Sequence, residues 1–159
     1  MLHPGLRFTC WFRFGHFCRS HKVLRFISKL VTLIILHQSR KTGIQINPGA
    51  TIGRGLYIPH YGGIVVNPQA IIGNYCYLSH NVLIGKVHTG MREGVPAIGD
   101  DVFVGTGAVI LGNLTIGNNA AIGANSVVIN DVPDDVFVAG APAKIVAQAG
   151  AKELLGRKV

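Results

Sequence analysis

The chain has 159 residues, enough for one domain with a substantial hydrophobic core and no need of disulfides. Ile, Leu and Val occupy 47 positions and Gly 21, while charged residues make up only 14%, which excludes a disordered chain, a collagen and a coiled coil. Cys10, Cys18 and Cys76 form an odd, scattered set, so the sequence offers neither a disulfide framework nor a zinc site of paired cysteines. We expect a reducing compartment.

The net charge of +8 lies entirely at the N-terminus. Residues 1–41 contain eight Lys or Arg and no acid, whereas residues 42–159 contain seven charges of each sign. Glycine is distributed the other way, with two residues in 1–41 and nineteen afterwards. The sequence therefore divides near Thr42 into a basic, aromatic-rich helical segment and a domain of different character over 42–159.

Residues 22–38 are predicted to form a helix, because they lack Gly and Pro and their apolar residues recur at helical spacing. The longest uninterrupted apolar stretch runs only from Leu33 to Leu36, which is too short to span a bilayer, and no small-residue cleavage site follows. The sequence supports neither a transmembrane helix nor a signal peptide, so we expect the chain in the cytoplasm.

Upstream, residues 6–20 interleave five aromatic residues with three arginines, a composition that suits the surface of an anionic membrane. The simpler interpretation is that helices within 1–41 cap the following domain and bury their aromatics there, as the ends of solenoids require. We prefer capping and keep peripheral membrane contact as an additional role. No nucleic-acid-binding module is recognisable, so we expect no nucleic-acid partner.

From residue 46 the chain repeats every six residues. The leading position is Ile, Leu or Val in all thirteen units, and Gly follows it directly in seven. The fifth position is mostly small or apolar, which makes Cys76 a core filler rather than a nucleophile. The leading residues are Ile46, Ile52, Ile58, Val66, Ile72, Leu78, Ile84, Ile98, Val104, Ile110, Ile116, Ile122 and Val128.

Such units describe short strands joined by tight turns, and three of them make one triangular coil. Coils stack with parallel strands about 4.8 Å apart, each burying its aliphatic residues against the next. The sequence therefore predicts an all-β fold, a parallel β-helix. The period leaves the hand of the coil open, and the general crossover rule alone favours a right-handed one.

The register slips twice, with two residues inserted between Ile58 and Val66 and eight between Ile84 and Ile98. The larger insertion must leave the coil as an exposed loop over 86–97, and long excursions from a regular scaffold are usually functional. After Val132 the pattern ends, and we expect a C-terminal tail over 133–159 with a basic end.

Two histidines occupy equivalent places in the repeat. His60 and His80 each lie two residues after the leading residue on the third side of a coil. Because equivalent positions stack, the two imidazoles are expected to project from one edge about one strand spacing apart, followed along that edge by Thr106 and then Ala124. A lone His is usually an ordinary surface residue, but this column is a candidate active-site wall.

Four segments carry a family resemblance: INPGATIGRGLYIPHYGGIVVN, LSHNVLIG, IGDDVFVGTGAVILGNLTIGNNAAIGANSVVINDVP and VAGAPAKIV. Over roughly residues 44–147 the sequence resembles the hexapeptide-repeat acyltransferases, in particular the short relatives of serine acetyltransferase that serve capsule and exopolysaccharide synthesis. The resemblance implies a left-handed β-helix, a homotrimer, and acetyl-CoA bound in the groove between adjacent subunits.

The resemblance also implies roles for single residues. His60, in IPHYGG, matches the family's catalytic histidine, the general base that takes the proton of the acceptor hydroxyl. His80 is a candidate substrate contact or second acid/base group, and His88 and Tyr61 are candidate contacts for the acceptor. The residues implied for acetyl-CoA are Thr106, Ala124, Ile129, Asn130 and Lys144. The ammonium of Lys144 suits the CoA phosphates, although an ordinary solvated lysine is the alternative.

Three places depart from serine acetyltransferase. Pro59 stands where that enzyme has an Asp that holds the serine amine, and Gly94 and Val95 stand where its loop has an Arg-His pair. Gln45 aligns with the carboxylate partner of the catalytic His. The groups that recognise an amino acid are therefore missing, and we predict a saccharide O-acetyltransferase of capsule, exopolysaccharide or lipopolysaccharide synthesis. A serine O-acetyltransferase of cysteine synthesis and a non-catalytic scaffold are the alternatives.

A zinc enzyme of the same fold, the γ-class carbonic anhydrase, is a further alternative. It needs three histidines on one metal, two of them closely spaced in the sequence. His60, His80 and His88 are 20 and 8 residues apart, which is a poor match, so we expect no metal.

Overall fold

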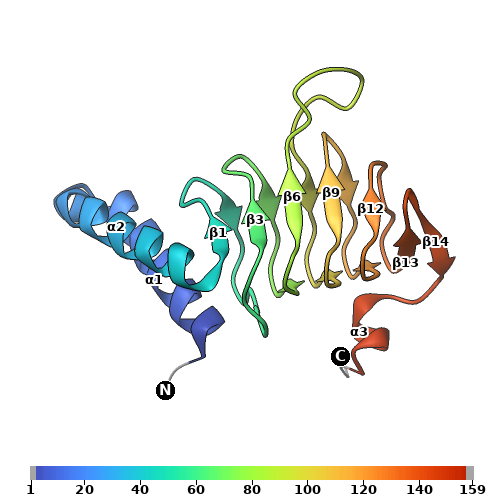
Figure 1. Ribbon diagram of the computed structural model, residues 1–159, viewed down its shortest axis with the longest axis horizontal. Coiled ribbons are helices and arrows are strands. Elements are labelled where there is room, and N and C mark those ends of the chain that lie inside the picture. Colours follow the sequence, from blue (N-terminus) through green and yellow to red (C-terminus); the bar gives the residue numbers. More distant parts are fainter. Residues whose placement is uncertain (1–2, 157–159) are drawn as a thin grey trace.

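The computed structural model describes residues 3–156 (Figure 1). Helix α1, Pro4–Ser20, and helix α2, Arg25–Thr42, are joined by a 3-10 turn, η1, Lys22–Leu24. The helix predicted over 22–38 begins three residues later, at Arg25, because residues 22–24 form the 3-10 turn. It runs on to Thr42, where Gly43 ends it in the left-handed conformation at φ +69°. Within the described residues, neither these helices nor any other is long and apolar enough to cross a membrane.

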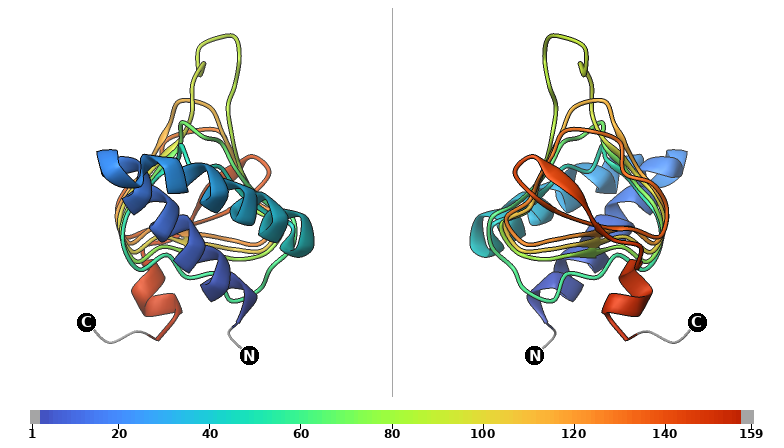
Figure 2. Two further views of the ribbon diagram at one scale, coloured as in Figure 1. Left: turned by 90° about the vertical axis from the view of Figure 1, so that its left-hand side faces the viewer. Right: turned by 90° about the vertical axis from the view of Figure 1, so that its right-hand side faces the viewer.

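Short strands follow and pair into three sheets, which form the three sides of a triangular coil (Figure 2). The first side contains β1, β3, β6, β9 and β12; the second contains β2, β4, β7 and β10; the third contains β5, β8, β11, β13 and β14. The strands are β1 Ile44–Ile46, β2 Thr51–Ile52, β3 Ile64–Val66, β4 Ile71–Ile72, β5 Tyr77–Leu78, β6 Leu83–Gly85, β7 Ala97–Ile98, β8 Phe103–Val104, β9 Val109–Leu111, β10 Thr115–Ile116, β11 Ala121–Ile122, β12 Val127–Val128, β13 Phe137–Gly140 and β14 Ala143–Ala147. All pairings are parallel except that of β13 with β14, so the predicted parallel β-helix is confirmed.

The interior of the coil follows the repeat. All thirteen leading residues are buried, and the small residues at the fifth position fill the space beside them. Cys76 is among these fillers, as predicted, and burial raises the pKa of its thiol to about 11. The corners stack closely, because a Cβ at Gly53 would lie only 2.6 Å from the carbonyl carbon of Gly73 in the next coil. Glycine is required there by space.

A loop lies where the sequence predicts one over 86–97, except that Ala97 already belongs to β7. It leaves the coil after β6 and returns at β7, and Figure 1 shows it projecting from one edge. Its two arms are joined by hydrogen bonds of 3.0 Å in both directions between Val87 and Gly94. Met91 near its tip is fully exposed.

The coil continues further than the repeat predicts. Val132 pairs with Ile116, and β13 pairs in parallel with β11, placing Val138 beside Ile122 and only 16 residues after it. This two-residue shortening breaks the six-residue period and hides the last turn of the coil from sequence reasoning. Strand β14 then folds back antiparallel on β13, and a short helix, α3, Ala151–Leu154, follows. The basic end of the predicted tail, 157–159, lies outside the described residues.

The helices cover the N-terminal end of the coil, which supports the predicted capping role. Phe8 and Phe12 of α1 are buried in the same core as the β-helix residues. Arg13 donates hydrogen bonds to the carbonyl oxygens of Ile52, at 2.6 Å, and of Gly53. Apolar contact and polar anchors therefore both hold α1 on the first coil.

Neighbouring isoleucines on β4 test the register. Ile72 is 1% exposed and its replacement by Ala should lower the free energy of unfolding by about 2–5 kcal/mol, through lost burial and a cavity. Ile71 is 51% exposed, and the same change there should cost less than about 1 kcal/mol. Urea unfolding followed by circular dichroism measures both. A larger loss at Ile71 than at Ile72 would contradict the register.

Candidate active site

His60 and His80 lie side by side, as the repeat predicts. Their ring centroids are 5.9 Å apart and their planes are nearly perpendicular, at 86°. Strands β5, β8 and β11 pair in register, so the positions two residues after each leading residue, including Thr106 and Ala124, continue the same edge. The predicted column is confirmed as an arrangement. The chemical roles of its members stay predictions.

The two imidazoles have different surroundings. His60 is exposed, whereas His80 is half-buried and its Nδ1 atom is buried without a hydrogen-bond partner among the described residues. The backbone of His80 is fixed, because its carbonyl oxygen accepts a hydrogen bond of 3.1 Å from the N–H of Gly107. A buried, unpaired ring nitrogen costs about 1–3 kcal/mol. The backbone of His80 is thus held in place, and its Nδ1 is closed off from solvent.

Gln45, which aligns with the family's carboxylate, lines a different feature. It lies on β1 in an apolar groove of about 420 Å³ between α2 and the first side of the coil. In the part of the chain that the structure describes, neither His60 nor His80 has a side chain within hydrogen-bonding distance of its ring. Within one chain, the ring of His60 therefore contacts the ring of His80 and not an amide side chain.

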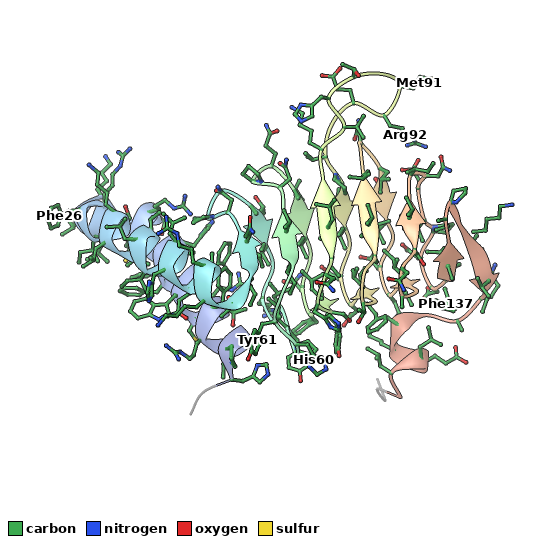
Figure 3. The ribbon with its side chains drawn as sticks, in the orientation of Figure 1. Phe26, His60, Tyr61, Met91, Arg92 and Phe137 are labelled. Carbon is green, nitrogen blue, oxygen red and sulfur yellow. The ribbon has the colours of Figure 1, made fainter. Side chains whose placement is uncertain are left out.

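Aromatic rings run along the third side next to the column. The rings of Tyr57 and Tyr77 are 5.3 Å apart between centroids, and those of Tyr77 and Phe103 are 4.9 Å apart. Tyr61, one residue after His60, is 52% exposed and lies with it at the lower edge in Figure 3. These rings offer an apolar surface beside the two histidines.

The loop and part of the residues predicted for acetyl-CoA lie at another edge. His60 precedes the first side of its coil, whereas the loop follows β6 of that side, and Ile129 and Asn130 follow β12. Figure 3 shows the separation, with His60 at one edge and Met91 at the opposite one. Within a single chain His88 therefore lies away from His60, and its contact with the acceptor in a groove between subunits stays a prediction.

Within one chain, the three histidines of the zinc alternative do not lie together. His60 and His80 are neighbours, but His88 extends from the opposite edge with the loop. Among the residues described, His, Cys, Asp and Glu side chains nowhere gather in a group of three that could hold a metal ion.

Lys144 lies on β14, opposite Ala139 of β13, at the C-terminal end of the third side. It is exposed, and within residues 3–156 it makes no ion pair. Its ammonium is therefore available to an anionic ligand, on the same side of the coil that leads to the histidine column.

An ion pair that sequence reasoning missed anchors the loop. Arg92 Nη1 lies 2.9 Å from Asp131 Oδ2 and donates a second hydrogen bond of 3.2 Å to the carbonyl oxygen of Asn113. The backbone N–H of Thr115, and after it the Arg92 guanidinium, hold the pKa of Asp131 below its ordinary value. Since 39 residues separate Arg92 from Asp131, no local pattern in the sequence points to this contact.

Loss of the anchor should loosen the loop. Asp131→Asn removes the carboxylate charge that holds Arg92, so trypsin should cut after Lys86 or Arg92 several-fold faster than in the unmodified chain. Limited proteolysis followed by mass spectrometry measures the rates. Because the pKa of Asp131 is lowered, its carboxylate stays charged, and the anchor stays formed, until the pH falls through that lowered value.

Glu93→Gln is the matched control for this variant. It removes one negative charge from the loop itself, and among the described residues the Glu93 side chain makes no ion pair. It should leave the cleavage rate unchanged. Equal acceleration in both variants would mean that net charge, and not the contact with Arg92, controls access to the loop.

Comparison with known proteins shows which family and which relatives the chain is similar to. Residues 96–130 match the family described as bacterial transferase hexapeptide (six repeats). The chain is 39% identical to the serine acetyltransferase of Bacillus subtilis, over 96% of this chain and 68% of that protein. It is 34% identical to the serine acetyltransferase of Helicobacter pylori strain J99, over 93% of this chain and 84% of that protein.

Solved structures of serine acetyltransferase have a similar fold. The crystal structure of serine acetyltransferase from Brucella abortus superimposes with a TM-score of 0.80 at 30% identity, covering 93% of this chain and 58% of that one. Its complex with coenzyme A gives a TM-score of 0.81, covering 92% and 57%. The chain thus spans less than three fifths of the Brucella chain. The β-helix is left-handed, as the resemblance implies and against the general crossover rule.

Proposed function

Because the chain belongs to the hexapeptide-repeat acyltransferases, in their serine-acetyltransferase-like branch, we propose that it transfers an acetyl group from acetyl-CoA to an acceptor hydroxyl. The observation that carries the proposal is the edge of the coil on which exposed His60 packs against half-buried His80, with Thr106 and Ala124 following. A ring at such an edge is open to an acceptor and held by its neighbour.

His60 acts as the general base. An alcohol is a poor nucleophile, and a positioned imidazole accepts its proton as the oxygen attacks the thioester of acetyl-CoA. His80 packs against the ring of His60 and limits its rotation. Neither role needs a metal ion.

The residues for acetyl-CoA fit the ligand only if two chains share a site. Thr106 and Ala124 lie on the histidine edge, and Lys144 offers an unpaired ammonium to phosphate, but Ile129 and Asn130 lie across the first side. A three-fold arrangement that sets the histidine edge of one chain against the loop edge of the next would unite them. It would also carry the loop, with His88 and Arg92, to the neighbour's His60. We therefore favour a homotrimer.

L-serine is the acceptor that the relatives support. The Bacillus, Helicobacter and Brucella proteins compared above are all named serine acetyltransferases, and a saccharide acceptor has no such support among them. Serine carries an ammonium and a carboxylate that must be paired. Pro59, Gly94 and Val95 cannot pair them, but in a trimer the loop of the neighbouring chain would bring Lys86 and His88 as candidate partners for the carboxylate.

A saccharide is the second candidate, and the aromatic side of the coil favours it. Tyr57, Tyr77 and Phe103 form a row of rings next to the histidine edge, and Tyr61 is exposed beside His60. Sugar rings bind against aromatic faces and ask for neutral hydrogen bonds rather than fixed charges. The substitutions at 59, 94 and 95 are consistent with such an acceptor.

His60→Ala should lower kcat by about 10²–10⁴-fold, because the acceptor loses its general base. Binding of acetyl-CoA, followed by calorimetry, and the sedimentation coefficient should be unchanged, since His60 is an exposed edge residue. The assay follows release of the CoA thiol. His16→Ala, an exposed histidine of α1, is the matched control and should keep full activity.

The activity of a His80→Ala variant shows whether His60 or His80 is the general base. Wild-type turnover in His60→Ala together with a large loss in His80→Ala would move the base to His80. Failure of the unmodified chain to bind acetyl-CoA at all would favour a non-catalytic scaffold.

A competition assay identifies the acceptor. With L-serine and a panel of free and nucleotide-linked sugars at equal concentration, we expect O-acetylserine to dominate the products. Mass spectrometry of the products, with consumption of acetyl-CoA as the measure of total turnover, reads the result. Acetylation of a sugar with no O-acetylserine would restore the saccharide interpretation and give the aromatic row its role.

A further inference from the structure

Helix α2 presents an apolar stripe on the side facing away from the β-helix. Val31 and Ile35 of this helix are buried in the core, which defines its inner face. Phe26, Leu30 and Leu33, at spacings of four and three, share the opposite face and are 87%, 61% and 62% exposed. We call these three residues the α2 outer stripe. Phe26 lies at the end of the cap farthest from the coil (Figure 3).

Unpaired cations border this stripe. Lys22 lies in η1 just before α2, Arg25 begins α2, Lys29 lies within it, and Arg40 and Lys41 lie in its last turn. All five are exposed. No acid occurs in residues 1–41. The ion pairs found within residues 3–156 join Arg92 to Asp131 and Lys152 to Asp101, so none of these five cations is neutralised.

We propose that the α2 outer stripe docks on the surface of an anionic lipid bilayer. An apolar stripe with flanking Lys and Arg is the arrangement by which a helix lies in a membrane interface, its apolar residues at the acyl boundary and its cations on the headgroup phosphates. The stems of Lys and Arg can lie along the apolar stripe while their charges reach the phosphates. This inference is independent of the proposed acetyl transfer.

The positive charge around the α2 outer stripe favours an anionic bilayer over a second copy of the chain as its partner. If a second copy of the chain covered the stripe in a two-fold contact, the same five cations would meet their own equivalents with no acid in either segment to compensate. Burying the stripe against a neutral surface would leave the cations without a role. A surface that is both apolar and negatively charged satisfies both features at once.

The structure offers a longer apolar surface on α2 than on the aromatic segment upstream of it. In that segment Phe8 and Phe12 close the coil, and of its aromatic residues only Phe14 and Phe17 stay about half exposed. The stripe on α2 is left unpartnered instead. Because it faces away from the β-helix, docking there leaves the histidine edge and the loop open to the acceptor (Figure 1).

Vesicle co-sedimentation of the full chain tests the proposal. We expect binding to vesicles of phosphatidylcholine with about one third phosphatidylglycerol, and little binding to phosphatidylcholine alone. Raising the salt from about 0.1 M to about 1 M shortens the screening length from about 10 Å to about 3 Å and should release the chain. Equal binding to both kinds of vesicle, or to neither, would overturn the proposal.

Two variants separate the apolar and the charged contributions. Phe26→Ser/Leu30→Ser/Leu33→Ser should lower the partition coefficient at least tenfold. Lys22→Gln/Lys29→Gln/Lys41→Gln should lower it by roughly fivefold for each cation. All six residues are exposed, and circular dichroism and the melting temperature check that both variants fold.

Leu154→Ser and Arg54→Gln are the matched controls, since they remove an exposed leucine and an exposed cation from elsewhere on the surface. Both should bind like the unmodified chain. An equal loss in the controls would overturn the assignment of the surface. So would a lipid-free assembly larger than the other variants form, if it dissociates in the triple-serine variant, because a second copy would then be the occupant of the stripe.

Discussion

The stacking of one large and one small inward residue on each side of the coil is the constraint on which the rest of this structure depends. The triangular interior has room for an aliphatic side chain at the leading position and a small one at the fifth, and both sets are buried along the coil. A residue gained or lost within a side would turn the inward set outward, so the hydrophobic pattern fixes the register of every coil. Residues can therefore be inserted or deleted only at the corners between the sides of the coil.

The candidate site is a consequence of that register. His60 and His80 are at corners, where a side chain contributes little to the packed interior, and they meet because successive third sides are in register. The loop also leaves the coil at a corner, but at the other end of the first side. The same rule that unites the two histidines therefore keeps the loop away from them. A site that includes both the histidines and the loop would therefore need two chains, as in the proposed homotrimer.

The sequence predicts what depends on local period. The thirteen inward aliphatics, the role of Cys76 as a filler, the stacked histidines and the loop over 86–97 all follow from counting in sixes. Prediction from the sequence fails where two segments distant in the chain meet, or where the six-residue period is broken. The turn of the coil ending at Val138 is hidden by a two-residue shortening, and the contact of Arg92 with Asp131 joins segments 39 residues apart. The left-handed coil is predicted only by the family resemblance, since the six-residue period is the same for both hands.

The two ends of the β-helix are closed by different interactions, and this difference leaves the α2 outer stripe exposed on the N-terminal cap. At the C-terminal end, β14 folds back on β13 and Lys152 of α3 pairs with Asp101, so charges of both signs lie there. At the N-terminal end, α1 supplies the closing contacts through Phe8, Phe12 and Arg13. Helix α2 packs on α1 and the first coil with only one face. Since a helix of 18 residues has two faces and the coil covers one, the other must be polar or meet a partner. Here it is apolar with cations of one sign around it, which selects an anionic, apolar surface.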